Sequence, residues 1–247
     1  MVSARMAANL GALLGVAALS ASLSSCSESV PPASAALNNG IIPGDAQLRF
    51  VNVSPNAPEL DLVVEGEVRF EEVAFGFVTD YTSVPAGSYD ISLAETDARE
   101  GDEDALLAND FTEFPGDRAY TVVALDEASR VSTLVLEDSQ PASLDEALVR
   151  FVHAIPDAPS LTLSAIGDRR DVIATATEFG SVSEYVAVEP DISEVEIFSS
   201  SGGDVQETLN VSLEVGRIYT VYALGLTRGT PNVDVAILED ASDFSPL

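Results

Sequence analysis

Short apolar segments, rich in β-branched and aromatic residues, alternate with turn sequences along most of the chain. In the first half they are residues 47–53, 59–65, 77–83, 88–94, 106–114, 118–125 and 130–137. The turns at 54–58, 84–87 and 115–117 carry proline, asparagine or glycine, and proline presets φ at the second turn position. Strands and turns at this spacing predict an antiparallel β-sandwich. No sustained 3.6-residue period follows the N-terminal region, so we expect little helix.

Two segments, around Tyr120 and Tyr219, are apolar on both of their alternating faces. A strand buried on one face alternates between apolar and polar residues, whereas a strand buried on both faces reads as a continuous apolar run. We therefore expect these two segments to lie centrally in their sheets.

The sequence contains two copies of one unit. Residues 49–66 (RFVNVSPNAPELDLVVEG) and 150–167 (RFVHAIPDAPSLTLSAIG) are identical at nine of 18 positions. Two later pairs of segments also match. RAYTVVAL at 118–125 matches RIYTVYAL at 217–224, and LVLED at 134–138 matches AILED at 236–240. The repeat predicts an all-β protein with two tandem antiparallel β-sandwich domains of the immunoglobulin-like type, residues 46–140 and 147–247.

The N-terminal region predicts export and membrane anchoring. Residues 1–25 combine Arg5, an apolar stretch too short to span a bilayer and a run of small residues, as in a signal peptide. The tetrad Leu23-Ser24-Ser25-Cys26 resembles the lipobox of bacterial lipoproteins, so we expect lipidation of Cys26. The alternative is an ordinary secretory signal with a chance cysteine. Residues 26–45, rich in Ser, Pro, Ala and Gly, predict a flexible tether.

The charge balance excludes one large class of partner. The chain has 41 acidic residues against 11 basic ones, a formal net charge of −30. Because binding to a phosphate backbone requires clustered lysine and arginine, we expect no nucleic-acid partner. The hydrophobic fraction of 46% is nevertheless high enough for a sizeable buried core.

Few residue types are available for catalysis or metal binding. With one histidine and one cysteine, the chain cannot supply the three or four ligands of a zinc site, and we expect no cofactor. An acidic run containing Asp97, Asp102 and Asp104 is a weak calcium candidate. Its spacing is not that of an EF-hand, and a solvated hairpin tip explains it better.

The single histidine, His153, lies at the end of a predicted strand, where the first repeat has Asn52. Either side chain can hydrogen-bond the backbone of the following Pro-x-Ala-Pro turn, which favours a structural role. The alternative is a general base. We take Asn52, Asp61, His153 and Asp157 together as a possible ligand-binding or turn-supporting set.

Three motifs resemble a known family. The string RFVHAIPDAP, the FG-x-V-x-x-Y segment and the late G-x-x-YTV strand are similar to the domain of unknown function 4397. The resemblance implies a β-sandwich module of exported prokaryotic proteins, often in tandem and lipid-anchored. It also implies a His before the turn and an Asp on the next strand. Here His153 is followed by Thr162, and Asp61 is preceded by Asn52, so neither copy carries both.

These observations predict a non-enzymatic, lipid-anchored protein of the cell envelope, on the outer membrane or another extracytoplasmic face. It would act as a binding, adhesion or scaffold module for an unknown envelope protein or polysaccharide. The alternative is an envelope hydrolase that uses carboxylates or His153. A cleft converging on His153, Asp157 and a third polar group would favour the hydrolase.

Overall fold

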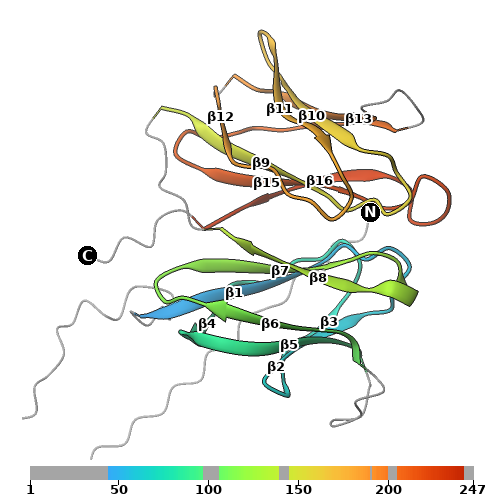
Figure 1. The fold of residues 1–247 in the computed structure, drawn as a ribbon. Coiled ribbons are helices and arrows are strands. Elements are labelled where there is room, and N and C mark those ends of the chain that lie inside the picture. The colour runs from blue at the N-terminus through green and yellow to red at the C-terminus, as the bar shows by residue number, and fades with distance from the viewer. Residues whose placement is uncertain (1–43, 97–105, 139–144, 190, 200–204, 242–247) are drawn as a thin grey trace, which may run out of the picture. The chain divides into compact units, whose positions relative to one another are not determined.

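Each repeat forms two four-stranded sheets in the computed structural model, which describes residues 44–96, 106–138, 145–189, 191–199 and 205–241 (Figure 1). The strands of repeat 1 are β1 (Asp45–Asn52), β2 (Leu60–Val64), β3 (Glu67–Val73), β4 (Thr82–Pro85), β5 (Gly87–Glu95), β6 (Leu106–Phe114), β7 (Ala119–Leu125) and β8 (Ser132–Glu137). Those of repeat 2 are β9 (Ala147–His153), β10 (Leu161–Ile166), β11 (Arg170–Thr177), β12 (Val186–Val188), β13 (Glu194–Ser199), β14 (Gln206–Asn210), β15 (Ile218–Leu224) and β16 (Asp234–Glu239). The described residues also include the short 3-10 turn η3 (Ala128–Arg130).

Both repeats have the same topology. The strand orders are β4-β1-β7-β8 and β3-β2-β5-β6 in repeat 1, and β12-β9-β15-β16 and β11-β10-β13-β14 in repeat 2. The predicted pair of all-β sandwiches is confirmed. One pairing in each repeat is parallel, β1 with β7 and β9 with β15, while the other ladders are antiparallel.

Alternation along the strands builds a separate core inside each sandwich. In β1 the side chains of Leu48 and Phe50 point into repeat 1, where they meet Leu62 of β2 and Leu93 of β5. Repeat 2 uses the matching positions, with Phe151 and Leu163 fully buried in its core. Each repeat therefore contains the apolar interior that a two-sheet sandwich requires.

The predicted central positions of the segments around Tyr120 and Tyr219 are confirmed, since β7 and β15 are inner strands. The outer face of these two strands is also apolar, because it contacts the other repeat. The outer face of β1 and β7 packs against that of β9 and β15, through Val51, Val53, Val123 and Leu125 of repeat 1 and Val152, Ala154, Tyr222 and Leu224 of repeat 2. Every residue of β7 and β15 is buried as a result, and residues 39–247 cluster as one compact unit.

One prediction about repeat 1 is wrong, and one strand was not predicted. Residues 77–83 do not form one strand, because a turn at Gly76 and a single bridge between Val51 and Val78 precede the short strand β4. The strand β3 was missed because only Phe70 and Val73 of its seven residues are buried. A bulge at Glu72, where φ is +56°, separates these two positions by three residues instead of two.

Residues 1–43, 97–105 and 139–144 lie outside the described part of the chain. The predicted signal peptide, the lipidated Cys26 and the calcium candidates Asp97, Asp102 and Asp104 therefore stay predictions. Among the described residues, no helix has the length and apolarity needed to cross a bilayer.

Candidate functional site

Two arginines and two aspartates are buried in the interface between the repeats. Arg49 of β1 forms an ion pair with Asp240, which directly follows β16. The second ion pair joins Arg150 of β9 to Asp138, which follows β8. Nη2 of Arg150 lies 2.5 Å from Oδ1 of Asp138. No side chain of the four is more than 5% exposed. Each repeat thus pairs its arginine with the aspartate of the other repeat.

A threonine joins each arginine to the aspartate of its own repeat. Nε of Arg49 donates to Oγ1 of Thr121 (2.7 Å), and that hydroxyl donates to Oδ2 of Asp138 (2.5 Å). Thr220 does the same between Arg150 (2.8 Å) and Asp240 (2.5 Å). The four charges and two hydroxyls therefore form one continuous network across the interface.

Tyrosines and backbone carbonyls complete the network. Tyr81 donates its hydroxyl proton to Asp138 (2.8 Å) while its ring lies 4.6 Å from the guanidinium carbon of Arg49. In the same way, the hydroxyl of Tyr185 donates to Asp240 (2.9 Å), and its ring lies 4.6 Å from the guanidinium carbon of Arg150. The remaining guanidinium nitrogens, Nη1 of the two arginines, donate to the carbonyl oxygens of Glu239 (2.9 Å) and Glu137 (2.8 Å).

The arrangement is a two-fold contact within a single chain. Arg49 contacts Asp240, and their counterparts Arg150 and Asp138 make the reciprocal contact, as in an isologous dimer interface. Each pair of residues occupies matching positions in the motifs that the repeats share: Arg49 with Arg150, Tyr81 with Tyr185, Thr121 with Thr220, and Asp138 with Asp240. These four matching positions therefore connect the two copies.

The charges of this interface network, the eight side chains just named, sum to zero. Burial alone would lower the pKa of Arg49, but Tyr81 and the two aspartates raise it. Burial raises the pKa of Asp240, Asp138 raises it further, and the two arginines oppose both effects. Burial also raises the pKa values of Tyr81 and Tyr185, which therefore stay protonated and act as hydrogen-bond donors. Removing one charge would leave its partner buried without compensation.

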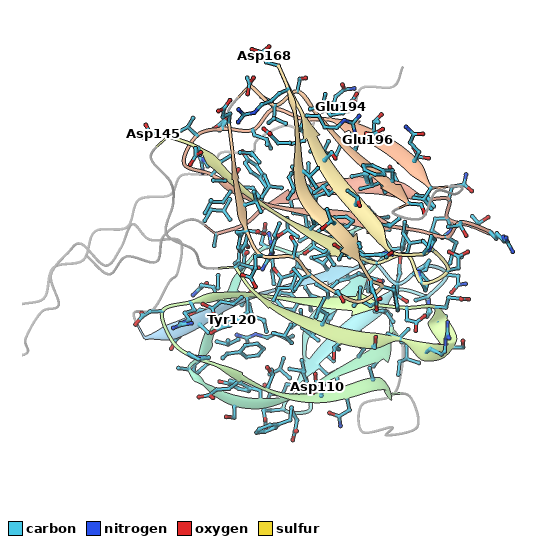
Figure 2. All side chains as sticks on the ribbon, turned by 45° about the horizontal axis from the view of Figure 1, so that its top comes forward. Asp110, Tyr120, Asp145, Asp168, Glu194 and Glu196 are labelled. Atoms are coloured by element: carbon cyan, nitrogen blue, oxygen red, sulfur yellow. The ribbon has the colours of Figure 1, made fainter. Side chains whose placement is uncertain are left out.

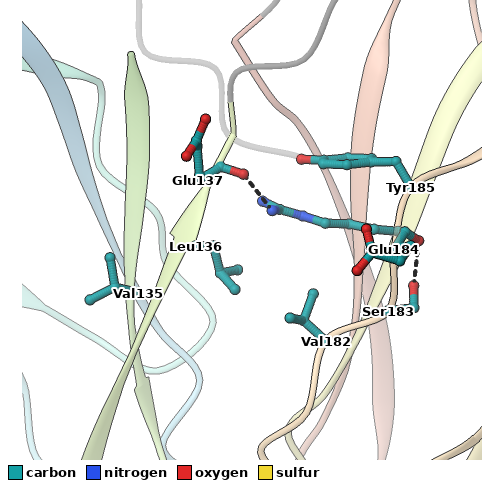
Figure 3. Close-up of a pocket in the computed structure, with 8 residues that line it drawn as sticks. Val135, Leu136, Glu137, Val182, Ser183, Glu184 and Tyr185 are labelled. Atoms are coloured by element: carbon teal, nitrogen blue, oxygen red, sulfur yellow. Dashed lines mark hydrogen bonds between the residues drawn. The ribbon is translucent and has the colours of Figure 1, made fainter. Parts of the chain in front are cut away.

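A groove of about 190 Å³ opens beside this network (Figure 3). It is lined by Val135, Leu136, Glu137, Arg150, Val182, Ser183, Glu184 and Tyr185. The guanidinium of Arg150 lies in it but already donates to Thr220, Glu137 and Asp138. This groove therefore presents no uncommitted cationic group to a ligand.

His153 and Asn52 each accept a hydrogen bond from the backbone N–H two residues later in the chain. Nδ1 of His153 accepts from the backbone N–H of Ile155 (3.2 Å), and Oδ1 of Asn52 accepts from that of Ser54 (3.1 Å). The other ring nitrogen of His153 donates to the carbonyl oxygen of Pro159 (3.0 Å), which fixes a neutral imidazole with its proton on Nε2. The ring is fully buried, and burial lowers its pKa.

Asp157 binds a different segment from the one that His153 binds. Its carboxylate accepts from the N–H and hydroxyl of Thr227 (2.8 and 2.6 Å) and from the N–H of Arg228 (3.0 Å). Slight burial would raise the pKa of Asp157, but these hydrogen bonds lower it. The side chain therefore ties the turn after β9 to the loop after β15, and the two predicted site residues do not converge on one point.

Asp61 supports the bulge in β3. Its Oδ1 accepts from the N–H of Glu72 (2.8 Å) and from the hydroxyl of Thr96 (2.7 Å). In repeat 2, Thr162 stands at the position of Asp61, and its hydroxyl lies 3.5 Å from the N–H of Ala176, where φ is +49°. Aspartate and threonine thus make the same type of contact to the same bulge.

The acidic side chains of the surface are spread over both repeats. Figure 2 shows Asp110 and Asp168 at the outside of the two sandwiches, whereas Tyr120 lies between the sheets of repeat 1. Within the described ranges, no group of three or more His, Cys, Asp and Glu side chains is arranged to hold a metal ion.

A family model described as a domain of unknown function (DUF4397) matches residues 46–164 and again residues 147–246. The two matches together cover most of the chain and include the whole interface network. The chain belongs to the DUF4397 family. The resemblance seen in the three motifs is therefore confirmed, and the tandem arrangement with it. No curated protein matches the sequence.

The solved structures that match this DUF4397 chain include two bacterial proteins. One is described as a putative cell adhesion protein from Bacteroides uniformis, with 10% identity, a TM-score of 0.27, and coverage of 79% of this chain and 96% of its own. The other has the same description and comes from Bacteroides ovatus, with 9% identity, a TM-score of 0.23, and coverage of 81% and 98%. Similarity of this degree carries no functional information about the DUF4397 chain.

The interface network predicts strong coupling between residues of different repeats. Arg49→Met and Asp240→Asn should each destabilise the protein by about 3–5 kcal/mol, because each leaves a buried charge unpaired. The loss of unfolding free energy in the double variant should be clearly smaller than the sum of the losses in the two single variants. Urea unfolding of the four proteins measures this coupling. The exposed pair of Arg118 and Glu137, with side chains 49% and 40% exposed, is the control and should show no coupling. Additive effects at Arg49 and Asp240 would contradict the network.

His153 predicts a pH dependence of stability. Because its pKa is lowered in the folded state, the unfolded chain binds a proton first as the pH falls below about 6.5. The stability contributed by His153 is complete above that pH and is lost below it. His153→Asn, which keeps the bond to Ile155, should therefore lose less stability than wild type between about pH 7.5 and 5.5. Urea unfolding across this range, with His153→Leu as the variant that loses the acceptor, measures the difference. Parallel pH curves for wild type and His153→Asn would refute it.

Proposed function

We propose that the protein is a non-enzymatic, lipid-anchored module of the cell envelope that binds an envelope protein or polysaccharide. One observation carries this proposal: the arginine, the threonine and the aspartate of the interface network, which both repeats share, are buried and bond to one another. In an enzyme, the reacting groups must lie within hydrogen-bond reach of a substrate. Here the shared residues join two sandwiches into one unit, which suits a binding or scaffold role.

The environment of His153 also favours binding over hydrolysis. A general base needs a free nitrogen near the proton that it removes. Both nitrogens of His153 are bonded to backbone groups of its own turn, and the ring is fully buried. The carboxylate of Asp157 is bonded to Thr227 and Arg228. These contacts support turn geometry, and they support the binding module over the envelope hydrolase.

The proposed anchor fits the order of segments along the chain. Cys26 would carry the lipid, residues 26–45 would act as the tether, and β1 begins at Asp45. A flexible tether of this length spans on the order of 25 Å, enough to hold a domain clear of the lipid headgroups. Because the chain carries a net charge of −30, an anionic membrane surface would repel the sandwiches and favour this separation.

The proposal is tested by cross-linking intact cells and then separating membrane from soluble fractions. Wild type should sediment with membranes and carry a reproducible cross-linked adduct, because it is both anchored and bound to a partner. Cys26→Ser should move to the soluble fraction, since the site of lipidation is lost. Sedimentation of Cys26→Ser with the membranes would overturn the anchor. Wild type without any adduct would overturn the binding function.

A further inference from the structure

Repeat 1 contains an apolar groove with an exposed aromatic residue. The groove has a volume of about 330 Å³ and is lined by Glu59, Glu72, Val73, Ala74, Phe77, Val78 and Thr79. Phe77 is 65% exposed and Val78 is 38% exposed. Phe77 and Val78 thus give this groove an apolar wall that is open to solvent, and two glutamates line the groove with them.

The backbone of the groove is held rigidly by its own hydrogen bonds. Gly76 donates to the carbonyl oxygen of Asn52 (2.7 Å), and Asn52 donates to that of Phe77 (3.1 Å). The N–H of Phe77 is bonded to Ala74 (3.1 Å), and that of Glu72 to Asp61 (2.8 Å). A partner would therefore meet a preformed surface, and little ordering of the chain would oppose binding.

Repeat 2 has the same backbone and keeps an exposed valine, Val182, at the position of Val78, but it lacks the exposed phenylalanine. Gly180 donates to His153 (2.9 Å), His153 donates to Ser181 (3.1 Å) and Ser181 to Glu178 (3.1 Å), in the pattern of repeat 1. The side chains differ, because Thr177, Glu178 and Ser181 replace Val73, Ala74 and Phe77. Since a serine satisfies the fold at this position, the fold does not require Phe77, and its exposure is better explained by a partner.

The charges around the groove select the chemistry of that partner. Glu59 and Glu72 are exposed members of its lining, and the lining includes no arginine. The whole chain carries a net charge of −30, so an anionic ligand or lipid headgroup would be repelled. An apolar side chain could cover Phe77 while flanking cations meet the two glutamates. A guanidinium could also stack on the phenyl ring.

We infer that this groove binds a basic peptide segment of a partner protein, one that carries an apolar side chain between arginines or lysines. The inference rests on the proposed binding function and names its site. Position supports it: β1 begins after the predicted tether and ends at Asn52, which is bonded to Gly76 and Phe77. A strand of this length spans about 25 Å, so the groove lies at the end of β1 away from the tether.

The test uses the purified mature protein and a fluorescent synthetic nonapeptide in which arginines flank leucine and phenylalanine. Fluorescence anisotropy should detect binding to wild type, and Phe77→Ser should weaken it by about tenfold or more, as for loss of an aromatic anchor. Glu59→Gln with Glu72→Gln should also weaken binding, and should reduce its dependence on salt. Thermal melting should find Phe77→Ser folded, because Ser181 occupies the same backbone in repeat 2.

Two controls isolate the groove. Phe111→Ser removes a phenylalanine that is 67% exposed on β6, outside the groove, and should leave the affinity unchanged. A peptide with glutamates in place of the arginines should not bind. Equal affinity of wild type and Phe77→Ser, no binding of the basic peptide, or preference for the acidic peptide would overturn the inference. Self-association of wild type that Phe77→Ser abolishes would overturn it in favour of a second copy.

The cross-linked adduct in cells tests the proposed function separately from the groove. An adduct that persists in Phe77→Ser would refute the groove as the binding site and leave the proposed function standing.

Discussion

Arg49 extends from repeat 1 to the carboxylate of Asp240, and Arg150 extends from repeat 2 to Asp138. These four charges are buried, and a charge removed from water destabilises the fold unless it is paired and hydrogen-bonded. With the repeats together, two positive and two negative charges balance one another. With the repeats apart, neither arginine would have its closest carboxylate. The outer faces of β1 and β9 can therefore be buried only against each other, and this constraint joins two sandwiches into one unit.

The two repeats are identical at the positions of the interface network and differ at other positions. Residues of the interface network are the same in both copies, whereas Ser181 of repeat 2 stands at the position of Phe77 in the groove of repeat 1. Within the apolar part of the interface, Tyr222 replaces Val123 and so breaks the two-fold symmetry. Duplication of a self-complementary sandwich, followed by divergence of the surface away from the contact, explains this pattern. On this account the interface network serves assembly, and Phe77 serves recognition.

Much of the fold could be predicted from the sequence, because strand period, turn residues and the internal repeat are local signals. The continuous apolar runs at β7 and β15 indicated burial on both faces of these strands. They did not reveal that the outer face is buried against the other repeat. Strand β3 was missed because the bulge at Glu72 hides its alternation. The interface network was not predicted: Arg49 and Asp138 stand in repeated motifs, but identity between copies does not distinguish a charge that faces solvent from one that faces a second sandwich. The signal that could have found them was an arginine directly between apolar residues in both β1 (LRFV) and β9 (VRFV).

The central claim is that reciprocal Arg–Asp pairing makes the two repeats unfold as one cooperative unit. Differential scanning calorimetry of the purified protein tests it most directly, by comparing the calorimetric and van't Hoff enthalpies. Wild type should give a single two-state transition, and the double variant Asp138→Asn with Asp240→Asn should give two. The control changes the neighbouring carboxylates, Glu137→Gln with Glu239→Gln, whose side chains are 40% and 47% exposed, and should keep the single transition. Two transitions in wild type, or one in the aspartate variant, would contradict the account.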